Sequence, residues 1–368
     1  MNYPTSQRRA SSNPRAGFRS GAARAFTLVE LLVSMTVLTV LLLIVTNVIS
    51  ETQKAWSQAS SRTTQFREAR AAFDLITRNL SQATLNTYWD YYRSNPGDAA
   101  TPPSRYERKS ELSFICGQAV NLLARGGGGA ICSTHAIFFQ APLGVSQEGA
   151  NAGLNNMLCG RGYFITYASD APYLPGFLPP SYAKQRFRLM EYSPPAERNR
   201  IYVENSRPSD NPTAWFDQDA VTVIAAGETT ETRSPTRPVA ENIVALIISP
   251  RLSPRETGAA GNPTRIAPAY AYDSSVVENA TATSPQGTQH LIPPLIEVTM
   301  VALDEPSAQR LETLAHSPSL AGDAGAMFTS AASYETDIRL LESYLVDKRL
   351  NFRIFRTTIG MRSSKWSL

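Results

Sequence analysis

The 368-residue sequence has few of the side chains that bind metals or act as nucleophiles. Its three histidines, each without a histidine or cysteine partner at the spacing of metal ligands, are His135, His290 and His316. Ser133 precedes His135 by two residues, but no third group or oxyanion motif completes a nucleophilic triad. The glycine run at 126–129 lacks the lysine that follows in a phosphate-binding loop. We therefore expect no metal, no cofactor and no enzymatic active site.

Cysteine is equally scarce, with Cys116, Cys132 and Cys159 at spacings that match no zinc-binding pattern. In an exported protein, three cysteines permit one disulfide among them and leave one thiol over. Three small, buried apolar side chains would explain the same residues. The sequence leaves both interpretations open.

Acidic residues are absent from residues 1–25, which form a basic leader with five arginines, Arg8, Arg9, Arg15, Arg19 and Arg24. The chain has 35 basic residues, and the 30 outside the leader are balanced by 31 acidic residues. The rest of the chain is therefore nearly neutral. A nearly neutral body has no basic stripe for nucleic acid. We expect no nucleic-acid partner.

Charge is also absent from residues 31–49, and proline is absent from residues 26–95. Nineteen uncharged residues in a helix span about 28 Å, close to the hydrocarbon thickness of a bilayer. Positive residues before such a segment stay in the cytoplasm, so the C-terminal part is exported. The residues after Ile49 form a poor signal-peptidase site, and the small residue of a cleavage site, Ala25, precedes the apolar run instead.

The stretch Arg24-Ala25-Phe26-Thr27-Leu28-Val29-Glu30 resembles the cleavage and methylation motif of type IV pilins and type II secretion pseudopilins. The resemblance implies that a prepilin peptidase cuts between Ala25 and Phe26 and methylates the new amine of Phe26. The family usually has glycine where this sequence has Ala25.

Glu30 is a carboxylate at the start of an otherwise apolar helix. Insertion of an acidic side chain into the membrane costs on the order of 3 kcal/mol of free energy, so a carboxylate at this position indicates a function. We expect Glu30 to pair with the Phe26 amine of a neighbouring subunit during assembly. The alternative is a carboxylate that only stabilises the start of its own helix through the helix dipole.

The helical spacing continues into the polar sequence that follows. Residues at steps of three and four form one apolar stripe, consisting of Phe66, Ala69, Phe73, Ile76, Leu80 and Ala83. One helix from Phe26 to about Leu85 is predicted, with its stripe against a globular body. A coiled coil is the alternative interpretation of the stripe.

Short runs rich in β-branched and aromatic residues predict strands in the body. They are Leu112–Cys116, Ala136–Gln140, Gly162–Tyr167, Arg186–Tyr192, Val221–Ala225, Asn242–Ile248, Leu295–Leu303 and Leu350–Thr358. Residues 305–315 and 334–348 predict helices, and long loops are expected at 94–105, 250–268 and 278–294. Without regular βαβ alternation, an α+β fold with an antiparallel sheet packed on the N-terminal helix is predicted.

These elements predict a leader at 1–25, a transmembrane segment at 26–50, an amphipathic continuation at 51–88 and an exported β-rich body at 89–368. The segments 241–254, 270–275 and 293–305 resemble the closing part of J-type minor pseudopilins. Together with the C-terminal residues 351–368, they make the whole chain resemble the family called Verru_Chthon cassette protein C. The resemblance implies a pilin-like fold.

We therefore expect a minor pilin-like or pseudopilin-like subunit of a type IV pilus-like or type II secretion-like filament, not an enzyme. Its expected partners are prepilin peptidase, other pilin-like subunits and the bacterial inner membrane, which it would cross once with its body in the periplasm. The alternative is a membrane-anchored extracytoplasmic binding module that does not assemble. A DNA-uptake or adhesion pilin is a third option, although the neutral body does not favour DNA uptake.

Overall fold

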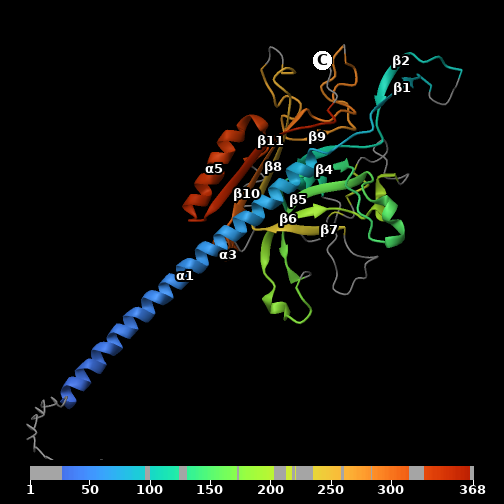
Figure 1. Ribbon diagram of the computed structural model, residues 1–368. Coiled ribbons are helices and arrows are strands. Elements are labelled where there is room, and N and C mark those ends of the chain that lie inside the picture. Colours follow the sequence, from blue (N-terminus) through green and yellow to red (C-terminus); the bar gives the residue numbers. More distant parts are fainter. Residues whose placement is uncertain are drawn as a thin grey trace, which may run out of the picture. The chain divides into compact units, whose positions relative to one another are not determined.

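The computed structural model describes residues 27–95, 100–123, 131–171, 174–202, 213–217, 220, 235–257, 261–282, 284–314 and 327–364. It is an α+β structure in which helix α1 (Leu28–Leu80) is followed by antiparallel strands, consistent with a pilin-like fold (Figure 1). The chain divides into two compact units, residues 1–58 and 59–368. Helix α1 contributes its first part to one unit and its last part to the other.

The strands of the body pair only in antiparallel fashion in the described residues. Their bounds are β1 (Tyr88–Tyr92), β2 (Arg105–Lys109), β3 (Ile115–Gln118), β4 (Ile131–Ala141), β5 (Cys159–Ser169), β6 (Gln185–Tyr192), β7 (Thr236–Glu241), β8 (Ile243–Arg251), β9 (Tyr272–Asp273), β10 (Leu295–Leu303) and β11 (Phe352–Gly360). The helices α2 (Ala119–Leu122), α3 (Glu305–Leu314) and α5 (Tyr334–Asp347) accompany them in the part of the chain that the structure describes.

Two sheets form most of the body. The larger one has the order β7-β6-β5-β4-β3-β9, and the smaller one has the order β11-β10-β8. A separate hairpin joins β1 and β2. The antiparallel pairing that the sequence predicted is confirmed, and it is divided between these sheets.

A bulge in β4 joins the two large sheets. The pairing of β4 with β5 shifts between Ser133 and Ile137, and Thr134 has a positive φ of 56° within this bulge. The bulge turns two side chains toward the edge of β8, as bulges commonly do. The hydroxyl of Thr134 accepts the N–H of Leu246 at 3.0 Å, and Nδ1 of His135 accepts the N–H of Ile248 at 3.0 Å. Side chains therefore replace a neighbouring strand along β8.

The last part of α1 packs into the body, as the apolar stripe predicted. Ala69, Phe73, Ile76, Leu80 and Ala83 are all buried in the hydrophobic core, and Phe66 is partly buried against it. The ring of Phe73 lies 5.8 Å from that of Phe355 in β11. The amide of Asn79 donates to the hydroxyl of Tyr163 in β5 at 2.7 Å, so α1 contacts both sheets.

Helix α1 ends at Leu80, five residues before the predicted end. The chain turns there because the N–H of Thr84 donates to the carbonyl of Gln140, at the end of β4, at 2.9 Å. The predicted helices at 305–315 and 334–348 are confirmed as α3 and α5. The predicted strand at 221–225 lies outside the described residues.

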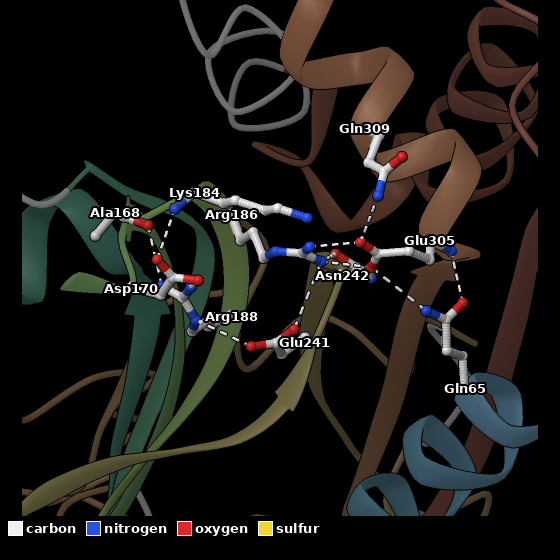
Figure 2. A network of polar contacts seen from close by, with 10 residues as sticks. All are labelled: Gln65, Ala168, Asp170, Lys184, Arg186, Arg188, Glu241, Asn242, Glu305 and Gln309. Carbon is white, nitrogen blue, oxygen red and sulfur yellow. Dashed lines mark hydrogen bonds and ion pairs between the residues drawn. The ribbon is translucent and has the colours of Figure 1, made fainter. Parts of the chain in front are cut away.

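A polar network connects α1, β6 and α3 within the body unit (Figure 2). The guanidinium of Arg186 forms a two-pronged ion pair with Glu305. The N–H of Glu305 donates to the side-chain oxygen of Gln65 at 2.5 Å. The carboxylate of Glu305 accepts hydrogen bonds from Asn242 and Gln309 at 3.0 and 2.9 Å. Arg186 above all holds the pKa of Glu305 down, to about 2. The network therefore fixes the start of α3 against the helix and the sheet.

Candidate functional site

The start of α1 carries the residues that the sequence selected. Thr27 precedes the first helical residue, and Glu30 is the third helical residue. The Oε2 atom of Glu30 accepts hydrogen bonds from the N–H and the hydroxyl of Thr27, both at 3.3 Å. In return, the N–H of Glu30 donates to the Thr27 hydroxyl oxygen at 3.2 Å. This reciprocal arrangement is a capping box, which satisfies two donors at the end of the helix.

The capping box occupies only one carboxylate oxygen of Glu30. Among the described residues, its Oε1 atom makes no hydrogen bond, and the side chain is exposed. The helix dipole favours a carboxylate at this position. The geometry therefore fits the alternative interpretation, in which Glu30 stabilises the start of its own helix. Among the described residues, the Oε1 atom remains available to a cation from another molecule.

The helix after Glu30 presents an apolar surface with nothing packed on it in the described residues. Every large apolar side chain from Leu28 to Ile49 is at least 50% exposed. An 18-residue stretch of Leu28–Ser57 has a mean hydropathy of 2.7, and this helix is long and apolar enough to cross a membrane. The predicted span at 31–49 lies within it.

The hydroxyl side chains between Leu28 and Ile49 form hydrogen bonds with the helix itself. The hydroxyls of Ser34, Thr36, Thr39 and Thr46 each donate to a backbone carbonyl three or four residues earlier, at 2.5 to 2.8 Å. Hydroxyls that bond to the preceding turn do not need water or a partner. The segment therefore exposes no unsatisfied hydroxyl to a hydrocarbon environment.

The predicted cleavage site lies outside the described residues, since these begin at Thr27. Ala25 and Phe26 therefore remain predictions from the sequence, as does the methylation of Phe26.

The cysteines do not form the disulfide that the sequence permitted within this structure. Cys116 and Cys159 are free, buried thiols, and burial raises the pKa of both. The side chain of Cys132 is outside the description. Any disulfide among the three cysteines needs Cys116 or Cys159, and both of these thiols are free.

His135 also has a structural environment. Its ring is fully buried; Nδ1 accepts the N–H of Ile248, and Nε2 donates to the carbonyl of Phe328 at 3.0 Å. Burial lowers its pKa to about 4, which keeps the imidazole neutral near pH 7. Both ring nitrogens are thus used in joining β4 to β8 and to the chain before α5.

Thr27 is not among the site residues predicted from the sequence. Its position three residues before Glu30 matches the sequence pattern of a capping box, so the signal was present in the sequence. The structure brings Thr27 and Glu30 together, whereas Cys116, Cys159, His135 and His290 belong to the body unit.

Comparison with known proteins identifies the same segment. Residues 21–46 match the family model described as the prokaryotic N-terminal methylation motif. Neither the curated proteins nor the solved structures gave a match. The motif indicates a prepilin-like protein that is processed by prepilin peptidase and assembled with other pilin subunits. Its apolar helix suggests membrane anchoring. The chain thus carries a prepilin-type methylation motif, on a body for which the comparisons gave no relative.

Proposed function

We propose that this protein is a minor, pseudopilin-like structural subunit of a type IV pilus-like or type II secretion-like filament, and that it has no enzymatic activity. Prepilin peptidase cuts after Ala25 and methylates the amine of Phe26. Before assembly, the subunit crosses the inner membrane once and holds its body in the periplasm. The sequence resemblance of segments 241–254, 270–275 and 293–305 to J-type minor pseudopilins, and of the whole chain to the cassette family, supports this proposal, and the size of the body favours a low-copy position near the filament tip.

The observation that carries this proposal is the combination at the start of α1. Glu30 keeps one oxygen on its own helix terminus and has no partner for the other among the described residues. It is followed by an apolar helical surface that no other described residue covers. In a filament, neighbouring helices cover that surface. The Oε1 atom of Glu30 then accepts a hydrogen bond from the charged amine of an adjacent subunit. Within a hydrocarbon-like environment, such a pair compensates both charges.

Substitution of Glu30 tests the proposal because glutamine can also complete a capping box. We expect Glu30→Gln and Glu30→Ala to insert into the membrane normally and to appear in sheared filaments at least about tenfold less than the wild type, since breaking a buried ion pair costs several kcal/mol. The measurement is the ratio of filament to membrane protein in cells that contain the prepilin peptidase and the other subunits.

Glu51→Gln is the matched control. Glu51 is exposed on the same helix, and among the described residues its carboxylate pairs with Lys54 of that helix at 3.4 Å. This variant should assemble like the wild type. Normal assembly of Glu30→Gln would show that the charge has no role in assembly and would favour an anchored extracytoplasmic binding module instead.

A further inference from the structure

The sheet edges of the body differ in how they are covered. At the edges of the larger sheet, β7 contains Pro238 and a register shift, and β9 has only two residues. The edge of β8 is occupied by Thr134 and His135 of β4. Strand β11 forms the other edge of the smaller sheet, is nine residues long and contains no proline. Within the described residues, no backbone group of β11 has a hydrogen-bond partner other than β10.

A groove runs along this uncovered edge. Its volume is about 510 Å³, and it is lined by consecutive residues of β11, from Arg353 to Ile359, and by one face of α1, from Arg70 to Arg78. All of these residues belong to the body unit. Because seven consecutive strand residues line the groove, it follows the edge of β11 and not only one face of the sheet. In an antiparallel pair, every second residue directs its N–H and C=O away from the partner strand, and these groups of β11 face the groove.

The groove is basic. Four arginines line it, Arg70, Arg78, Arg353 and Arg356, together with a single carboxylate, Asp74. Arg70 pairs with Asp74 at 3.1 Å, and Arg356 pairs with Glu297 and with Glu335. Arg78 and Arg353 are exposed, and neither has an ion-pair partner among the described residues. The groove therefore has two uncompensated positive charges beside an unpaired strand edge.

We propose that this groove binds an extended, acidic segment of another subunit, which adds a strand to β11. The backbone of that segment pairs with the free N–H and C=O groups of β11, and its carboxylates pair with Arg78 and Arg353. Addition of a strand supplies affinity through backbone bonds and specificity through side chains. This inference rests on the proposed function in taking the partner to be a co-assembled subunit.

The same charges disfavour a second copy of this chain as the occupant. Pairing of β11 with another β11 would bring two basic grooves together, and like charges across strands are destabilising. Basic side chains on an edge also oppose uncontrolled pairing. An acidic segment is instead attracted by the basic groove, so the charges favour it over a second copy of this chain.

Peptide binding to the full chain in detergent micelles tests the inference. The probe is a blocked, fluorescent nine-residue peptide in which glutamate alternates with valine. One comparison peptide has lysine in place of glutamate, and another keeps glutamate but carries N-methyl groups on alternate backbone amides. We expect fluorescence anisotropy to show saturable binding of the first peptide and at least tenfold weaker binding of the other two.

Variants locate the binding. The double variant Arg78→Glu, Arg353→Glu should bind the acidic peptide at least about fivefold more weakly, because two attractions become repulsions. Arg339→Glu, an exposed position on α5, is the matched control and should bind like the wild type. Thermal unfolding of each variant checks that the fold is retained.

Equal binding of the lysine or N-methylated peptide would overturn the proposal, and so would unchanged binding by the double variant. Self-association of the wild-type chain that the double variant abolishes would identify a second copy as the occupant and would also overturn it. The groove does not include Glu30 or the cleavage site. Failure of N-terminal processing would therefore refute the proposed function without changing peptide binding, and the two failures are distinguishable.

Discussion

At the scale of single residues, His135 shows how a side chain that could take part in catalysis is committed to the fold. Its ring is fully buried and hydrogen-bonded on both nitrogens, across the junction between β4 and β8. Protonation would place a charge without a counterion there and would remove the acceptor for the N–H of Ile248. The folded protein therefore resists protonation of this residue.

The lowered pKa of His135 predicts a dependence of stability on pH. The pKa falls from an unfolded value near 6.5 to about 4 in the fold, so between these values the unfolded chain binds the extra proton. The contribution of neutral His135 to the free energy of unfolding is fully present above pH 6.5. It declines as the pH falls toward 4, by on the order of 3 kcal/mol. Thermal unfolding of the full chain in detergent measures this decline, and His135→Gln should make it shallower.

His290→Gln is the control for this measurement. Burial also lowers the pKa of His290, but that side chain is only partly buried, so its replacement should alter the slope less. A slope that His135→Gln leaves unchanged between pH 4 and 6.5 would contradict the assignment. Glu305 does not confuse the result, because its lowered pKa removes stability only below about pH 4.5.

Residues also mark the limit of what the sequence could predict about the site. The spacing of Thr27 and Glu30 is local, and their capping box could be read from the sequence. The contacts of His135 could not, because its partners Ile248 and Phe328 are more than a hundred residues away. Local patterns carry local geometry, whereas the contacts of a buried polar residue depend on the tertiary fold.

At the scale of elements, α1 was predictable because its two parts have clear patterns. Its first part is apolar on all sides, and its last part has a single stripe whose members are buried. The hairpin strands β1 and β2 were missed because they are exposed and rich in charged or tyrosine residues, without alternating burial. Strand β3 begins later than predicted because Ser113 donates its N–H to the side chain of Gln140, not to a neighbouring strand.

The same substitution at two positions of α1 distinguishes its two parts. Leu80 is fully buried in the core, so Leu80→Ala should lower the free energy of unfolding of the body by about 2 to 5 kcal/mol. Leu41 is 53% exposed and lies in the apolar first part of the helix, so Leu41→Ala should leave that free energy unchanged. Denaturant unfolding of the full chain in detergent, followed by near-ultraviolet circular dichroism, compares them. An equal loss in both variants would contradict the division of the helix.

At the scale of the whole molecule, the chain combines a short segment that matches a known family model with a large body for which the comparisons gave no relative. The methylation motif spans residues 21–46 and indicates how the protein is processed. The body consists of antiparallel sheets whose pairing depends on distant contacts, such as those between β8 and β10. Sequence patterns predicted most of its strands, but not their division into two sheets, since the bulge at Thr134 that joins them has no sequence period. The helix therefore indicates the function, and the surface of the body indicates the partner.

The mass of the N-terminal peptide, measured in cells that contain prepilin peptidase, decides whether this chain is processed as a prepilin. We expect a mature chain that lacks residues 1–25 and begins with N-methylated Phe26. A chain that retains its arginine-rich leader under these conditions would show that it is not a prepilin.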